Sequence, residues 1–182
     1  MKYYKLNINS LSDEQYKKIY NEVDLIRRKK CDLLKKSNDK KRCLAAYYLI
    51  VKTFLEEYNL KINNIDYSND YPVLDIPYNI SISHCDNWVV LAISRKKIGI
   101  DIEKIRPMNF DIMRYFCSDD DFNYIGTDLK KFFEVWTFKE AFFKANKKGI
   151  SRESKKINFN DYSKTYDYFN NYIVCLYEET QE

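Results

Sequence analysis

The sequence predicts an α+β protein, because its helical and strand patterns fall into separate runs. Residues 129–147 carry apolar side chains at helical spacing and contain neither Gly nor Pro, which predicts a long amphipathic helix. Residues 38–58 show a second broad apolar stripe of this kind. Residues 79–103 instead hold three short runs divided by polar turns, as successive strands do. A chain of 182 residues can bury a core as one domain or as two small halves.

Composition favours a folded protein without a metal-thiolate or disulfide framework. Aromatic residues make up 16% of the chain and hydrophobic residues 45%, which argues against disorder. The net charge of +4, from 31 basic and 27 acidic residues, does not by itself indicate nucleic-acid binding. Five scattered cysteines without a C-x-x-C pair predict neither disulfides nor zinc. Because no leader and no apolar run of roughly 18 residues is visible, we expect a reduced cytoplasmic protein.

The N-terminal elements follow from alternation and capping signals. Alternation within residues 1–8 predicts a first strand. Ser12 is a helix N-cap with Gln15 as its capping-box partner, and this helix is expected to reach about Arg28. The polar residues 63–77 hold two of the three prolines and are expected to be loop with short extended pieces. Three successive strands are then expected at residues 79–84, 88–94 and 98–103.

The C-terminal elements are read in the same way. Residues 110–116 predict a short helix, and Ser118 with the three aspartates after it predicts the start of another that ends near Ile125. Gly149 is the expected stop of the long helix. The final strands are expected at residues 155–160, 165–169 and 172–177, the last two joined by a hairpin turn at Asn170-Asn171.

Two carboxylates in the strand 98–103 are candidate metal ligands. Asp101 and Glu103 are two residues apart, so in an extended strand they share one face while Ile100 and Ile102 pack behind them. Hard oxygen ligands at this spacing suit Mg²⁺, which takes one or two carboxylates, waters and a substrate phosphate. An isolated Asp-x-Glu is more often part of an ordinary half-buried strand, so the metal hypothesis depends on other motifs in the chain.

The helix 129–147 carries a second charged group. Glu140 and Lys144 are four residues apart and are therefore neighbours on its surface. Taken alone, they are an ion pair worth about a few tenths of a kcal/mol. Trp136 lies one turn before Glu140, and we expect it to pack the helix against the sheet.

Three segments in this order resemble the motifs of the Sfp-type 4'-phosphopantetheinyl transferases. They are residues 79–84, which begin with Asn and end with Ser-His, the G-I-D-x-E strand 98–103, and W-x-x-K-E-A-x-x-K at 136–144. The resemblance covers residues 24–149. It implies a 4'-phosphopantetheinyl transferase-like α+β fold, a pseudo-dimer of two similar halves with the active site between them. The expected halves are residues 1–105 and 106–182, the second with a shortened sheet.

The resemblance also implies an activity. Members of this family move 4'-phosphopantetheine from coenzyme A to a serine of an acyl, peptidyl or aryl carrier protein and release 3',5'-ADP. The partners implied are therefore coenzyme A and a carrier protein, with no nucleic acid and no membrane, and the chain is expected to be a monomer. The carrier could belong to fatty-acid synthesis or to nonribosomal peptide or polyketide synthesis.

Roles for the acidic and basic residues follow from the same resemblance. Asp101, Glu103 and Glu140 would hold Mg²⁺, with Mn²⁺ as an alternative because a site with few protein ligands discriminates weakly. Glu140 would be the general base on the serine. Lys144, together with Lys139, would pair with phosphate oxygens as charge moves to the departing ADP.

A basic cluster at residues 27–42 is the expected coenzyme A site. It would form a positive patch able to attract phosphates or an acidic partner, although a solvated charge run is an equal alternative. In the resembling family, basic residues here bind the phosphates of coenzyme A, and Arg27, Lys30 and Arg42 are nearest to the matching positions. The alternatives within the cluster are Lys29, Lys36 and Lys41.

Two further positions take their assignment from the family. Ser83 and His84, the latter the single histidine of the chain, are implied to contact a phosphate or the ribose of coenzyme A. Asp120 or Asp121 is the counterpart of an acidic family residue that is usually Glu, and N-capping alone also explains these aspartates.

Two other classes of protein compete with the transferase. One is a non-catalytic binding module that docks an acidic protein through the basic cluster. The other is a nucleic-acid-binding domain that uses Lys and Arg with nearby aromatic residues. Neither explains three motifs in order, so the transferase is the preferred interpretation.

Overall fold

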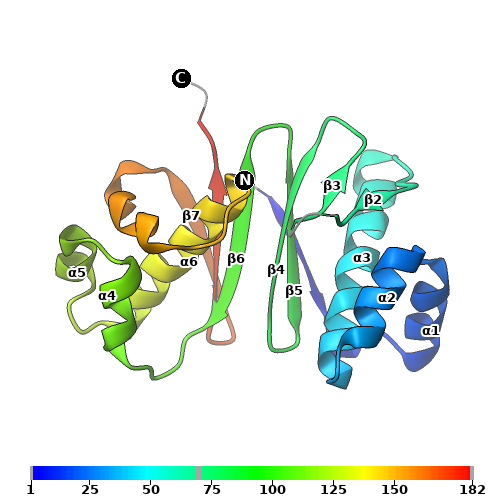
Figure 1. The fold of residues 1–182 in the computed structure, drawn as a ribbon, viewed down its shortest axis with the longest axis horizontal. Coiled ribbons are helices and arrows are strands. Elements are labelled where there is room, and N and C mark those ends of the chain that lie inside the picture. Colours follow the sequence, from blue (N-terminus) through cyan, green and yellow to red (C-terminus); the bar gives the residue numbers. More distant parts are fainter. Residues whose placement is uncertain (1, 69–70, 181–182) are drawn as a thin grey trace. The chain divides into compact units, whose positions relative to one another are not determined.

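The computed structural model describes residues 2–68 and 71–180, and these residues form two compact units. The N-terminal unit is Lys2–Arg95, and the C-terminal unit begins at Lys96. Each unit combines a three-stranded antiparallel sheet with helices, which confirms the α+β class (Figure 1). Across the described ranges, no helix has the length and apolar character needed to cross a membrane.

In the N-terminal unit the sheet has the order β1-β5-β4, and the long helix α3 packs on it through β5 (Figure 1). The strands are β1 (Tyr3–Asn7), β4 (Asn79–Cys85) and β5 (Trp88–Ser94), with β2 (Ile65–Asp66) and β3 (Val73–Leu74) as a separate short ladder. The helices are α1 (Asp13–Glu22), α2 (Leu25–Leu33) and α3 (Ser37–Tyr58), and a 3-10 turn η1 covers Ile8–Ser10.

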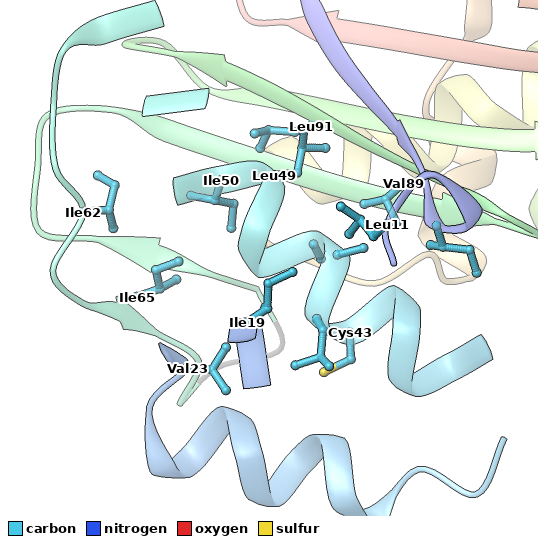
Figure 2. Packing of buried hydrophobic residues seen from close by; sticks show 14 of the residues in the cluster. Leu11, Ile19, Val23, Cys43, Leu49, Ile50, Ile62, Ile65, Val89 and Leu91 are labelled. Atoms are coloured by element: carbon cyan, nitrogen blue, oxygen red, sulfur yellow. The ribbon is translucent and has the colours of Figure 1, made fainter. Parts of the chain in front are cut away.

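The core of this unit lies between α3 and the sheet. Leu49 and Ile50 of α3 and Val89 and Leu91 of β5 are buried there (Figure 2). The apolar spacing of residues 38–58 therefore serves to cover one sheet face, since burial of apolar surface is the main driving force of folding.

The expected single helix from Ser12 to Arg28 was wrong, although its capping box is confirmed. The Ser12 side chain accepts a hydrogen bond from the backbone N–H of Gln15, and the Gln15 side chain accepts one from the backbone N–H of Ser12. The helix α1 ends at Glu22. Asp24 then starts α2, because its side chain accepts the backbone N–H of Arg27 at 2.8 Å. Asp is a strong N-cap residue, and here it sets Arg27 in the first turn of a new helix.

In the C-terminal unit the sheet has the order β6-β8-β7, with α6 packed against β6 and β8 (Figure 1). The hairpin turn predicted at Asn170-Asn171 is confirmed, because both residues have the positive φ, 46° and 64°, that a type I′ turn needs. The strands are β6 (Ile98–Lys104), β7 (Lys164–Phe169) and β8 (Tyr172–Glu178); the helices are α4 (Met113–Phe116), α5 (Asp119–Ile125) and α6 (Leu129–Ala145); and the 3-10 turns are η2 (Phe110–Ile112), η3 (Arg152–Lys156) and η4 (Phe159–Asp161).

Residues 155–160 were expected to form a strand, and this prediction was wrong. They form the end of the turn η3, the start of the turn η4 and the two capping residues between these turns. The carbonyl oxygens of Ser154 and Ile157 accept the Lys139 ammonium at 2.8 and 3.0 Å. These backbone groups are thus satisfied by a side chain rather than by a neighbouring strand.

The division into units differs from the expected halves at one element. We expected β6 to close the first half, with the boundary after residue 105, whereas the chain passes from one compact unit to the other between Arg95 and Lys96. The physical reason is that β6 pairs along its length with β8, from Ile98 opposite Glu178 to Lys104 opposite Tyr172.

Candidate active site and ligand cavity

A close approach of helix to strand builds the acidic site of the C-terminal unit. A Cβ atom placed on Gly99 of β6 would lie 1.8 Å from the carbonyl oxygen of Ala141 in α6. Only glycine therefore fits, and the backbones of the two elements meet at this point. The contact brings the residues that follow Gly99 in β6 next to those around Ala141, including Asp101 and Lys144.

Asp101 is held by an ion pair with α6. Its side chain is 6% exposed, and Oδ1 accepts the Lys144 ammonium at 2.6 Å. Lys144 is 30% exposed, so it bridges between solvent and the buried carboxylate. Ile100 and Ile102 are buried on the other face of β6, as the alternation of the strand predicted.

Glu103 is positioned by an aromatic donor. The indole Nε1 of Trp136 donates to Glu103 Oε1 at 3.2 Å, and the ring stands edge-on to Phe116 with centroids 4.7 Å apart. The sequence predicted only a packing role for Trp136. A signal for the second role was present, because a half-buried Trp N–H needs an acceptor and the acidic strand supplies one.

Burial and neighbouring carboxylates raise the pKa values of Glu140 and Glu103. Burial raises the pKa of Glu140 to about 6, the charge of Asp101 and then that of Glu103 add to the effect, and Lys144 opposes it. Burial and Asp101 likewise raise the pKa of Glu103, while the Trp136 hydrogen bond lowers it. Three carboxylates thus lie close together with Lys144 and Arg106 as the cations that act on them, and the remaining repulsion favours an added cation.

The donor chemistry of this site fits Mg²⁺, while the side-chain geometry alone does not complete a metal site. The candidates Asp101, Glu103 and Glu140 all offer hard carboxylate oxygens. Among the residues that the structure describes, no group of three or more His, Cys, Asp or Glu is arranged to hold a metal ion. Mg²⁺ commonly takes only one or two carboxylates and fills its shell with waters and phosphate oxygens. The residues present therefore fit an ion that binds together with a phosphate ligand.

Lys139 does not belong to this site, contrary to its expected role at phosphate. Its side chain is 0% exposed, and its Nζ donates to Asp121 Oδ2 at 2.6 Å. The same ammonium donates to the carbonyl oxygens of Phe116, Ser154 and Ile157. It lies five positions before Lys144 on α6, so its side chain points in a different direction, toward the interior of the unit.

The aspartates at the start of α5 have structural partners. Asp121 is buried, completes a capping box with Ser118 and pairs with Lys139. Asp120 is exposed and accepts the side-chain amide of Asn158 at 3.3 Å. The capping box and the buried pair account for Asp121, while Asp120 has the Asn158 amide as its partner.

The N-terminal unit contains a basic cavity of about 310 Å³. Helices α2 and α3 supply three cations and one carboxylate to its wall, and the segment after β2 and strand β4 supply an aromatic ring and the histidine. The charged and aromatic lining residues are Arg27, Lys30, Asp39, Arg42, Tyr67 and His84. The spacing of Arg27 and Lys30 on α2, and of Asp39 and Arg42 on α3, is three residues, which puts each pair on one helix face.

The two arginines of the cavity are fixed by protein contacts. Arg27 is 7% exposed and donates from Nη2 to the carbonyl oxygen of Cys43 at 2.7 Å. Arg42 pairs with Asp39 and donates from Nη1 to the carbonyl oxygen of Asp86 at 2.5 Å. Both guanidinium groups are therefore held rigidly at the wall, which suits recognition of an anion.

The remaining predicted residues of this region separate into two groups. Lys30 and His84 line the cavity, while Ser83, between Ile82 and His84 on β4, is buried on the other face of the strand because successive side chains alternate. The alternatives Lys29, Lys36 and Lys41 do not line the cavity, and Lys41 pairs with Asp13 at 3.4 Å. Tyr67 lines the cavity and was missed, since an isolated Tyr in a polar loop gives no sequence signal.

Comparisons with known proteins find similarity to 4'-phosphopantetheinyl transferases. The family model described as ACPS, the 4'-phosphopantetheinyl transferase superfamily, matches residues 97–180. The 4'-phosphopantetheinyl transferase gsp of Aneurinibacillus migulanus is 35% identical over 120 residues, which cover 62% of this chain and 51% of that protein. The 4'-phosphopantetheinyl transferases ffp and Sfp of Bacillus subtilis are 30% and 29% identical over 151 residues, which cover 78% of this chain and 67% of each relative. The match thus spans between about half and two thirds of these relatives' length.

Proposed function

Because this chain belongs to the 4'-phosphopantetheinyl transferase superfamily, we propose that it transfers the 4'-phosphopantetheine group of coenzyme A to a serine of a carrier protein. The serine oxygen forms a bond to the phosphorus of the phosphopantetheine end. The bond between that phosphorus and the oxygen bridging to ADP breaks, and 3',5'-ADP leaves. The observation that carries the proposal is the group of Asp101, Glu103, Glu140 and Lys144 on two elements that touch at Gly99.

Glu140 is the proposed general base for the serine hydroxyl. A pKa raised to about 6 by burial and by neighbouring carboxylates leaves it largely ionised at neutral pH, yet basic enough to accept a proton. We propose that the Lys144 ammonium, which pairs with Asp101 in the free protein, donates hydrogen bonds to the phosphoryl oxygens when the substrate is bound. Its side chain is 30% exposed, so it is accessible to a ligand.

Asp101, Glu103 and Glu140 are the residues proposed to hold Mg²⁺, with Mn²⁺ as the alternative. A divalent ion bound there would neutralise charge on the pyrophosphate as a Lewis acid. Trp136 contributes by fixing Glu103 through its N–H. Lys139 has no part in this proposal, because its ammonium is enclosed by protein acceptors.

The basic cavity of the N-terminal unit is proposed to bind phosphate of coenzyme A through Arg27, Lys30, Arg42 and His84. Three cations against one carboxylate leave the wall positive, which favours a phosphate. We further propose that the protein acts as a cytoplasmic monomer on acyl, peptidyl or aryl carriers, without nucleic-acid or membrane partners.

Intact-mass spectrometry tests the proposed reaction. An apo carrier protein is incubated with this chain, coenzyme A and Mg²⁺, beside a sample with EDTA. The expected result is a gain of one phosphopantetheinyl group that EDTA prevents. Glu140→Gln should abolish the gain, and the exposed control Glu153→Gln should not. No gain on peptidyl, aryl and fatty-acid carriers would refute the proposal and favour a binding module.

A further inference from the structure

Tyr67 lines the basic cavity, and its hydroxyl is buried. The Arg27 guanidinium lies over the Tyr67 ring in a cation–π contact, with its central carbon 4.2 Å from the ring centroid. Within residues 2–68 and 71–180, the Tyr67 hydroxyl has no hydrogen-bond partner. A buried polar group normally has a partner, because leaving it unsatisfied costs free energy.

Two other buried donors of the cavity share this property. Arg27 Nε and Arg42 Nε also lack a hydrogen-bond partner in the part of the chain that the structure describes. The other contacts of both side chains are made by Nη atoms or the guanidinium face. Three residues that line the cavity, from α2, α3 and the segment after β2, thus each have a buried donor without a partner among the described residues.

The Tyr67 hydroxyl remains a donor at physiological pH. Burial raises its pKa far above the ordinary value, and the neighbouring Arg27 only partly offsets this effect. The hydroxyl therefore adds a proton donor to the cavity without adding a negative charge. Asp39 is the only acidic residue in the described lining, and it is engaged by Arg42.

We propose that the Tyr67 hydroxyl is a specificity determinant that donates to the phosphate monoester of coenzyme A, beside Arg27 and Arg42. This inference rests on the proposed function, which assigns the pyrophosphate to the carboxylate group of the C-terminal unit. A monoester has three terminal oxygens and can accept from three donors at once, whereas each phosphate of a pyrophosphate diester has two. The cavity would then distinguish coenzyme A from its analogue without that phosphate.

Isothermal titration calorimetry with two ligands tests the role of Tyr67. Tyr67→Phe removes the hydroxyl and keeps the ring under Arg27. The variant should bind coenzyme A about tenfold more weakly than the unmodified protein, which is about 1.4 kcal/mol. The affinity for dephospho-coenzyme A should change less than about twofold, because that ligand lacks the phosphate monoester to which the hydroxyl is proposed to donate.

The control is Tyr48→Phe, which removes a hydroxyl from α3 outside the cavity and should change neither affinity. The melting temperature of Tyr67→Phe should stay equal or rise, since an unsatisfied buried group is removed. An equal loss of affinity for both ligands, or no loss for coenzyme A, would overturn the inference while normal transfer left the proposed function standing. An unmodified protein that binds neither ligand would overturn both.

Discussion

The Lys144 ammonium lies 2.6 Å from Asp101 Oδ1, so a cation already occupies one side of the candidate metal ligand. The pair connects α6 to β6 across the contact at Gly99. An added metal ion and Lys144 therefore compete for the same carboxylate charge, and a phosphate ligand would relieve that competition by taking up Lys144.

Lys144→Met should separate metal binding from catalysis. In the absence of coenzyme A, the variant should bind Mg²⁺ more tightly, severalfold to about tenfold, because a competing charge near the carboxylates is removed. Transfer should fall strongly, since no ammonium is left for the phosphoryl oxygens. Mg²⁺ titration by calorimetry checks the first effect, with the exposed Lys148→Met as control. Weaker Mg²⁺ binding by Lys144→Met would contradict the competition.

Gly99→Ala should destabilise the C-terminal unit severely. The added Cβ would overlap the Ala141 carbonyl oxygen at 1.8 Å, and backbone cannot yield as a flexible side chain does. A loss of about 3 kcal/mol or more in unfolding free energy is expected from such overpacking. Urea denaturation measures it. Gly149→Ala is the matched control, because a Cβ there meets nothing within 4 Å. Similar stability of the two variants would show that the contact is not tight.

Stability should fall as pH rises through the range in which Glu140 ionises. Its pKa is raised from 4.5 to about 6 in the folded protein, so between these values the folded state binds more protons than the unfolded state. The contribution to unfolding free energy is therefore greatest below about pH 4.5 and is lost above about pH 6. The magnitude is about 1–2 kcal/mol.

Glu140→Gln checks this pH dependence. The amide cannot ionise, so the unfolding free energy of the variant should decline less than that of the unmodified protein between pH 4.5 and 7. Urea denaturation at several pH values without divalent ions gives both curves. Parallel curves would mean that Glu140 has an ordinary pKa in the folded protein. Glu103 shifts in the same direction and remains in the variant, so part of the decline in unfolding free energy should persist there.

Lys139→Met should act on stability and not on coenzyme A binding. The ammonium is fully buried against Asp121 and three carbonyl oxygens, and its removal leaves a buried carboxylate without its partner. The free energy of unfolding is expected to fall by about 3–5 kcal/mol. Adding Asp121→Asn should restore part of it. A protein that keeps its melting temperature but loses coenzyme A affinity would reinstate the phosphate role that the sequence suggested.

Trp136→Phe should alter metal dependence more than stability. Phe retains the aromatic contact with Phe116 but has no N–H for Glu103. Since the hydrogen bond lowers the pKa of Glu103, its loss should weaken Mg²⁺ binding about twofold to tenfold near pH 6. The melting temperature should fall only slightly. A large fall in melting temperature with unchanged Mg²⁺ affinity would return Trp136 to a packing role alone.

The sequence by itself determined what depends on neighbours along the chain. Capping boxes at Ser12 and Ser118, the hairpin turn at Asn170-Asn171 and the shared face of Asp101 and Glu103 all arise from residues a few positions apart. Their geometry is fixed by helical and strand periodicity. The order of the motifs was sufficient to predict the family.

Tertiary structure decided which of two similar residues meets which environment. Lys139 and Lys144 belong to one helix, and only the packing of α6 shows that the first faces Asp121 and the second Asp101. Tyr67 lines the basic cavity together with residues far away in the sequence. Residues 155–160 do not form the expected strand, and the carbonyl oxygen of Ile157 accepts a hydrogen bond from the distant Lys139. Such contacts depend on how whole elements pack and on which buried polar groups they must satisfy, and no local pattern records that.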